Sequence, residues 1–160
     1  ENRGLSVRFI KDALLEDLGI TGTETVHFIE PTIRKKGQGV TCPRDNKEGA
    51  AYVDVAPDRL AGTANLMLSY TWKYTLKQIQ SSLVRYCELK DKKLDETRVW
   101  ICCFCVNQHR VQEALSQKKV VTTEKFRETF KSRVRSAGTV VGLLSPWRNP
   151  EYVKRVWCLF

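Results

Sequence analysis

Three groups of side chains that suit a flat heteroaromatic ligand follow three apolar segments of this sequence. They are Ser69, Tyr70 and Trp72, then Asn107, Gln108 and His109, and finally Ser145 and Trp147. Aromatic rings stack on such a ligand, and a few hydrogen-bonding groups fix its orientation. If the apolar segments are parallel strands of one sheet, their carboxyl ends share one edge and these groups line one pocket. The alternative is that the tryptophans, Trp157 included, only seal the edge of the core.

The residues after Trp147 predict a helix that begins at the same edge. Asn149 suits the N-cap, Pro150 suits the first helical position, and Glu151 suits the positive end of the helix dipole. The free backbone N–H groups of a helix N-terminus bind phosphate. The predicted pocket therefore offers both a stacking surface and a seat for an anion.

Motifs that identify common hydrolases, phosphate-binding loops and zinc proteases are missing. The sequence has no G-x-S-x-G elbow, no G-x-x-x-x-G-K-[ST] loop and no H-E-x-x-H word. Cys105 and His109 could form a nucleophile–base pair. A thiol inside so apolar a run is expected to have a raised pKa, however, and to be inert.

Three of the six cysteines, Cys102, Cys103 and Cys105, lie in one strand-like run. Neighbouring side chains on a strand point to opposite faces, so we expect no disulfide within this cluster. We interpret these cysteines as buried free thiols of a protein in the reducing cytoplasm. A metal site formed by Cys103, Cys105 and His109 is the alternative, but its spacing matches no standard zinc pattern and we expect no metal.

Alternating strands and helices from residue 65 onward are expected to position these groups. The predicted strands are residues 65–70, 99–106 and 138–144, and the predicted helices are residues 75–90, 123–138 and a third that starts at Asn149. Residues 90–98 and 110–122 are predicted to be loops. The uniformly apolar second strand fits a central parallel strand that is covered on both faces. We predict an α/β fold with an open, mainly parallel sheet and helices on both faces.

The first 60 residues are expected to form an extension of the α/β domain that spans residues 61–160. Residues 5–18 carry apolar side chains at helical spacing and predict an amphipathic helix. Residues 19–49 are rich in glycine, threonine, proline and lysine, and predict loops with at most one strand, near Val26–Ile29. Residues 50–55 predict a short strand.

The composition is typical of one globular domain, with 160 residues of which 42% are apolar. No run reaches the roughly 18 to 20 apolar residues of a transmembrane helix, and the start shows no secretory signal. Glu1 and Phe160 both read as cuts through a longer chain. The net charge of +9 is spread along the sequence, which is typical of a solvated surface and favours anionic ligands. Nucleic-acid binding is the less favoured alternative that this charge leaves open.

Three words occur in order along the chain: LSYTW (Leu68–Trp72), VWICCFCVNQH (Val99–His109), and LSPW followed by RVWCLF (Leu144–Phe160). They resemble the TIR-like superfamily, and most closely its heterokaryon-incompatibility (HET-like) branch and related domains of protists. The resemblance covers roughly residues 60–160 and implies a TIR/flavodoxin-like sheet. Cys102 stands where the HET-like word usually has aspartate, so any role of that carboxylate is missing in this sequence.

The resemblance implies a signalling domain that binds NAD or a related nucleotide and that in some members cleaves it. TIR domains often carry a W-C-x-x-E word, whose glutamate is the catalytic carboxylate of NAD-cleaving members. Residues from Trp157 to Phe160 match its first four positions, so the glutamate is expected directly after Phe160 and the 160-residue chain is expected to be inactive. The resemblance also places Ser69, Tyr70 and Trp72 on the pocket wall and the ligand-binding Trp157 beside the missing acid, with Asn107 and Gln108 on the same sheet edge. Many members are instead non-catalytic modules that signal by self-association, which is the main alternative.

Overall fold

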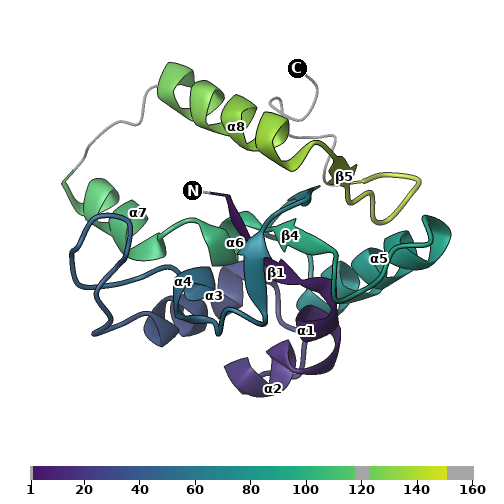
Figure 1. The fold of residues 1–160 in the computed structure, drawn as a ribbon, viewed down its shortest axis with the longest axis horizontal. Helices are drawn as coiled ribbons and strands as arrows, with labels where there is room; N and C mark the ends of the chain where they lie inside the picture. The colour runs from purple at the N-terminus through teal and green to yellow at the C-terminus, as the bar shows by residue number, and fades with distance from the viewer. Residues whose placement is uncertain (1, 118–122, 151–160) are drawn as a thin grey trace.

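The computed structural model describes residues 2–117 and 123–150. In these residues, one mixed five-stranded sheet has the order β2-β1-β4-β3-β5. Figure 1 shows the fold, with strands β1, β4 and β5 labelled. The strands are β1 (Arg3–Ser6), β2 (Ala61–Thr63), β3 (Leu66–Ser69), β4 (Arg98–Trp100) and β5 (Val140–Gly142). β3 pairs in parallel with β4 and β5, whereas β1 pairs antiparallel with β2 and β4. The predicted α/β class is confirmed, with parallel pairing around β3 and antiparallel pairing around β1.

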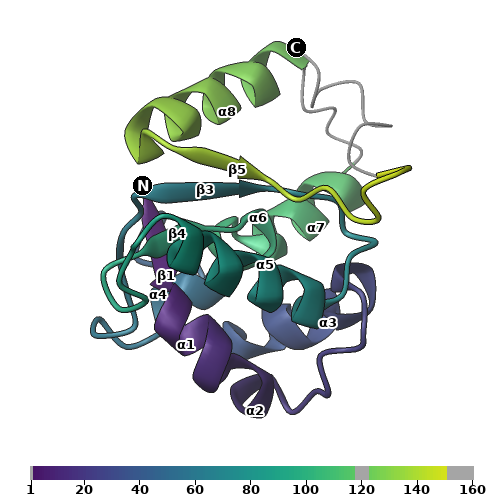
Figure 2. The same ribbon diagram turned by 90° about the vertical axis from the view of Figure 1, so that its right-hand side faces the viewer.

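Helices lie on both faces of the parallel part of the sheet. α5 (Leu76–Leu89) connects β3 to β4, and α8 (Thr123–Ala137) precedes β5. Figure 2 shows α8 above β3 and β5, and α5 below them. The chain therefore leaves β3 toward one face and reaches β5 from the other. The carboxyl ends of β3 and β5 form a topological switch point, the place where open α/β sheets bind ligands.

The sequence signals of α5 are confirmed. The Thr75 side chain accepts the Gln78 backbone N–H, and the Gln78 side chain accepts the Thr75 N–H, which together form a capping box. The inner face of α5 buries Leu76, Ile79 and Leu83 completely and packs on α1 (Val7–Asp12). Each of these side chains stabilises the fold by about 1.5–3 kcal/mol.

Other predicted elements of the C-terminal half are also confirmed. The strands predicted at residues 65–70 and 138–144 are β3 and β5, and the helix predicted at residues 123–138 is α8. Residues 90–97 form turns and unstructured chain, as predicted. The helix predicted after Pro150 lies outside the described residues.

The strand predicted at residues 99–106 is wrong beyond Trp100. Cys102–Cys105 instead form a single helical turn, α6. A run that is apolar at every position does not distinguish a buried strand from a buried helical turn. Phe104 at its centre is fully buried and its ring lies 5.3 Å from the Tyr52 ring, so burial inside the protein, rather than strand pairing, explains the apolar sequence.

The loop predicted at residues 110–122 is wrong for its first part, where α7 (Gln108–Ser116) continues the chain. Asn107 is the N-cap of this helix, because its Oδ1 accepts the backbone N–H groups of His109 and Arg110. A good cap thus starts a helix where the polar composition indicated a loop.

The amphipathic helix predicted at residues 5–18 is wrong at its start and broken in its middle. Leu5 lies in β1, Ser6 caps α1, and α2 (Leu14–Leu18) follows as a separate helix. β1 lies between β2 and β4 in the sheet, so strand pairing overrides the helical spacing of these residues. The start of the chain therefore contributes to the same sheet as the C-terminal strands.

The loops predicted at residues 19–49 are wrong where α3 (Val26–Lys36) forms. Its buried side chains are Val26, Ile29, Glu30 and Ile33. Pro31 lies inside the helix and costs up to about 3 kcal/mol there. Burial of three apolar side chains at helical spacing contributes about 1.5–3 kcal/mol each and outweighs that cost.

The strand predicted at residues 50–55 is also wrong, because Tyr52–Val55 form the short helix α4. Its apolar run is too short for periodicity to separate the two structures. α4 packs on α3 and α6, and the Tyr52 hydroxyl donates to Asp17 Oδ2 at 2.6 Å. Tertiary packing therefore decides the structure of this segment.

Tyr74 provides a test of how the switch point is held together. Its hydroxyl donates to the Leu143 carbonyl at 3.0 Å and accepts the Ser145 N–H at 3.1 Å, and the residue is 3% exposed. Tyr74→Phe is expected to lower the free energy of unfolding by about 1–3 kcal/mol, because both backbone groups lose their partner. Urea denaturation measures this loss. Tyr86→Phe, at a half-buried tyrosine of α5, is the matched control, and equal losses in the two variants would contradict the prediction.

Candidate functional site

Tyr70 and Trp72 follow β3 and are tied to the start of α6. The Trp72 indole N–H donates to Cys102 Sγ at 3.3 Å, and the Cys102 thiol donates to Tyr70 Oη at 3.3 Å. Tyr70 is buried, whereas Trp72 and Cys102 are half-buried. The Trp72 ring also meets the His27 ring edge-on, with centroids 5.4 Å apart. These contacts hold Trp72 in place, which fits the alternative that this residue seals the edge of the core.

Ser145 and Trp147 follow β5 on the other side of the switch point. The Gln78 amide donates to Ser145 Oγ at 3.4 Å, so the loop after β5 is fixed to the first turn of α5. Trp147 is 77% exposed. It therefore does not seal the core, and its ring is available to a ligand or a partner. Trp157 lies outside the described residues.

The first and third predicted groups are brought together by strand pairing. The carbonyl of Ser69, the last residue of β3, accepts the backbone N–H of Leu143 at 2.9 Å, and Ser145 follows two residues later. Half-buried Ser69 and half-buried Ser145 thus flank the junction of the two strands.

The second predicted group makes its hydrogen bonds inside the protein. The Asn107 amide N–H donates to the Gly49 carbonyl at 2.8 Å, and the Gln108 amide donates to the carbonyls of Cys102 and Val106 at 3.3 Å each. Asn107 and Gln108 are 8% and 4% exposed. Both side chains therefore support the backbone around α6 and α7, rather than facing a ligand.

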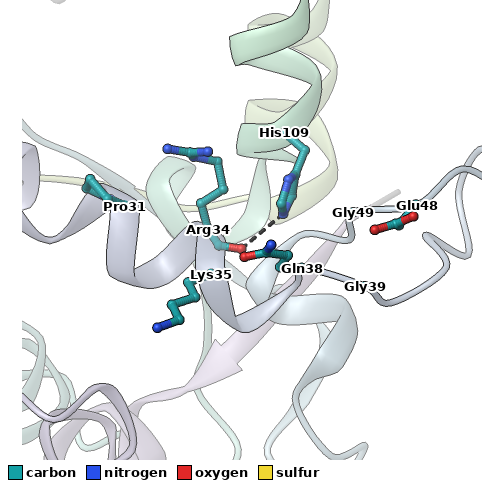
Figure 3. Close-up of a pocket in the computed structure, with 8 residues that line it drawn as sticks. All are labelled: Pro31, Arg34, Lys35, Gln38, Gly39, Glu48, Gly49 and His109. Carbon is teal, nitrogen blue, oxygen red and sulfur yellow. Dashed lines mark hydrogen bonds between the residues drawn. The ribbon is translucent and has the colours of Figure 1, made fainter.

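His109 lies in a surface pocket of about 450 Å³ that the sequence did not predict (Figure 3). The lining residues are Pro31, Arg34, Lys35, Gln38, Gly39, Glu48, Gly49 and His109. His109 Nε2 lies 2.9 Å from the Arg34 carbonyl oxygen. The ring packs on Gly49, where a Cβ atom would stand 2.7 Å from His109 Cγ, and the φ of +90° there also favours glycine.

This pocket suits a small polar molecule rather than covalent catalysis. Its lining residues include charges of both signs and no serine, threonine or cysteine nucleophile. The Arg34 guanidinium is already paired with the buried Glu30 carboxylate at 3.0 Å. The signal that could have found the pocket is the spacing of apolar residues in α3, because that helix supplies three of the lining residues.

Arg110 of α7 forms ion pairs and a hydrogen bond that connect α7 to the loop preceding α4. Its guanidinium pairs with Asp45 at 2.6 Å and with Glu113 at 2.5 Å, and it donates to the Glu48 carbonyl at 2.9 Å. The hydrogen bond from Arg110 holds the pKa of the Asp45 carboxyl well below its usual range. The wall of the His109 pocket therefore depends in part on an ionised Asp45.

Cys105 and His109, considered from the sequence as a nucleophile–base pair, each form a hydrogen bond with a different backbone group. Cys105 Sγ accepts the Ile101 N–H at 3.3 Å, and the His109 ring is bonded to the Arg34 carbonyl. Burial raises the pKa of the Cys105 thiol to about 12. At neutral pH it is therefore a protonated thiol, as the apolar run predicted.

Three further observations concern residues 2–117 and 123–150. Their cysteines are free thiols, and no three His, Cys, Asp or Glu side chains among them are grouped so as to hold a metal ion. None of the helices in these ranges is long and apolar enough to cross a membrane.

The depressed pKa of Asp45 predicts an acid sensitivity of the loop. Such a carboxylate stabilises the fold fully above the unfolded pKa of about 3.9, and this contribution is lost as the pH falls below that value. The difference in unfolding free energy between wild type and Asp45→Asn is expected to be larger at about pH 5 than at about pH 3. Chemical denaturation at both pH values measures it. Asp58→Asn, at a carboxylate that is 94% exposed, is the control, and a pH-independent difference for Asp45→Asn would refute the prediction.

No family model matches this sequence, and no curated protein or solved structure is significantly similar to it.

Proposed function

We propose that this chain binds NAD or a related nucleotide at the edge formed by the carboxyl ends of β3 and β5. The observation that carries the proposal is the switch point itself, with an exposed tryptophan beside it. The Trp147 side chain is 77% exposed. It follows β5, one of the two strands that form the switch point. An exposed aromatic surface at that position is what a nicotinamide or adenine ring requires for stacking.

The surroundings of Trp147 supply the remaining features of a nucleotide site. Ser69 and Ser145 are half-buried hydroxyl groups at the junction of the strands, and they suit the ribose hydroxyls. The net charge of +9 favours a ligand that carries phosphates. Half-buried Trp72 forms the inner wall and separates the ligand from the core.

Cleavage of the nucleotide is the second part of this proposal. Departure of nicotinamide leaves an oxocarbenium-like ribose, which a carboxylate stabilises or attacks. The TIR-like resemblance implies that the glutamate of the W-C-x-x-E word supplies this carboxylate. Nicotinamide release is therefore proposed for a chain that carries this acid, and nucleotide binding is proposed for the 160-residue chain.

Trp147→Ala is expected to weaken nucleotide binding about 5- to 150-fold, because stacking of a base on an aromatic ring contributes about 1–3 kcal/mol. Isothermal titration calorimetry with NAD and with ADP-ribose measures the dissociation constants. Leu89→Ala removes another exposed apolar side chain, 65% exposed at the far end of α5, and is expected to bind like wild type. Absence of saturable binding of either nucleotide to the wild-type chain would overturn the proposal.

Self-association is a second candidate function, and the position of β5 favours it. β5 is the outer strand of the described sheet. Val140 is 41% exposed, Leu144 is 36% exposed, and Trp147 follows them. An edge strand with exposed apolar side chains is a surface on which a second copy of the chain can pair.

Val140→Lys is expected to shift the chain toward the monomer if this edge mediates self-association, because a lysine on an edge strand opposes pairing. Sedimentation velocity at increasing concentration measures the shift. Leu115→Lys, which changes an exposed leucine of α7, is the matched control. A wild-type chain that stays monomeric at every concentration would remove this candidate and leave nucleotide binding unaffected.

A further inference from the structure

The single turn α6 places Cys102 and Cys105 three residues apart on one side of a helix. Side chains at this spacing have Cβ atoms about 5–6 Å apart, and a disulfide requires about 3.5–4.5 Å. Cys103 lies between them in sequence, and its side chain points roughly 100° away around the helix. In a helical turn, unlike in the strand predicted from the sequence, one pair of this cluster is therefore nearly in position for a bridge.

The two thiols of this pair have different surroundings. Cys102 is half-buried, and its sulfur lies between the Trp72 indole and the Tyr70 hydroxyl. Cys105 is 1% exposed, and its sulfur accepts the backbone N–H of Ile101. In a pair of an accessible and a buried thiol, the accessible thiol reacts with the oxidant and the buried one resolves the resulting mixed disulfide.

A small change in the backbone of α6 can bring the Cβ atoms of Cys102 and Cys105 close enough for a disulfide. Ile101 and Val106 on either side are extended, so the turn is one isolated unit. It is closed by hydrogen bonds from the Cys105 N–H to the Ile101 carbonyl and from the Val106 N–H to the Cys102 carbonyl, both 2.9 Å. A movement of about 1–2 Å between the two Cβ atoms changes this turn and leaves the pairing of β4 intact.

We propose that Cys102 and Cys105 form a reversible dithiol–disulfide couple, in which Cys102 reacts first with a small-molecule disulfide and Cys105 closes the bridge. Cys102, as thiolate, attacks one sulfur of the oxidant, breaks its S–S bond and releases one thiolate. Cys105, a protonated thiol at neutral pH, then gives its proton to the thiolate released in the first step and attacks Cys102 Sγ, which forms the internal S–S bond and releases the second thiolate. The two protein thiols are oxidised by two electrons, the oxidant is reduced to two thiols, and these take up the two protons.

Closure of the bridge changes the surroundings of Trp72 and Tyr70, because both contact Cys102 Sγ. Trp72 forms the inner wall of the edge proposed to bind a nucleotide. The redox state of the couple would then tune that site, an effect that rests on the proposed function. Formation of the bridge itself does not depend on it.

The test uses the folded chain, incubated with oxidised glutathione and then alkylated before digestion with trypsin. The peptide between Arg98 and Arg110 contains all three cysteines of the cluster. It is expected to lose two hydrogen atoms and to escape alkylation at two positions, and a dithiol reductant is expected to reverse both changes. In Cys103→Ser the same loss is expected, which assigns the bridge to the remaining pair.

Two further variants resolve the order of the steps. Cys105→Ser is expected to stop at a mixed disulfide with glutathione on Cys102, and Cys102→Ser is expected to leave the peptide unmodified. Cys87→Ser, at a buried cysteine of α5, is the control and is expected to bridge like wild type. Circular dichroism verifies that each variant is folded. Peptide analysis of the oxidised wild-type chain tests bridge formation even if a variant does not fold.

Several results would overturn the proposal. A wild-type peptide that stays fully reduced while the chain is folded would show that Cys102 does not react. A bridge that survives in Cys105→Ser and disappears in Cys103→Ser would assign it to the adjacent pair instead. Unchanged nucleotide binding after bridge formation would contradict only the link to the site, whereas absent binding in both redox states would contradict the proposed function alone.

Discussion

The parallel pairing of β3 with both of its neighbours is the constraint on which the rest of this structure depends. Parallel strands cannot be joined by a tight turn, so each pairing requires a crossover connection. α5 serves the connection to β4, and the stretch that ends in α8 serves the connection to β5. Because these crossovers lie on opposite faces, the carboxyl ends of β3 and β5 form a topological switch point. Trp147, which is 77% exposed, follows β5 beside this switch point.

The N-terminal residues complete the core that this parallel unit requires. β1 pairs with the free side of β4, and the helices that follow β1 extend the core around that strand. Arg44 shows how the parts are joined, because its guanidinium donates to Asp54 at 3.0 Å and to the Cys105 carbonyl at 2.8 Å. The Asp54 carboxylate is only 1% exposed. Loss of one partner from such a buried ion pair typically costs about 3–5 kcal/mol, so this contact fixes α4 and α6 to the loop between α3 and α4.

Elements with local signals were predictable from the sequence, and elements decided by distant packing were not. Thr75 and the apolar spacing after it specify α5 without reference to other parts of the chain. α6 is different, because every residue of its run is apolar and only its burial against Tyr52 decides between strand and helix. For the site, the convergence of parallel strand ends correctly predicted that the groups after β3 and β5 lie close together, and their binding of a ligand stays a prediction. Asn107 was predicted to face the pocket because the sequence does not show that its amide N–H donates to the Gly49 carbonyl. The His109 pocket was not predicted because it forms between α3 and α7, which are distant in sequence.

Asn107 illustrates how tightly one position can be restricted by chemistry. Its oxygen accepts the first N–H groups of α7, and its nitrogen donates to Gly49. Aspartate would lack the donor, serine would lack the second polar atom, and glutamine would be one methylene too long to cap the helix. Asparagine is thus the single natural side chain that performs both tasks at once. Asn107 and Gly49 therefore act as one unit, so that a change at position 107 affects both the start of α7 and the loop before α4.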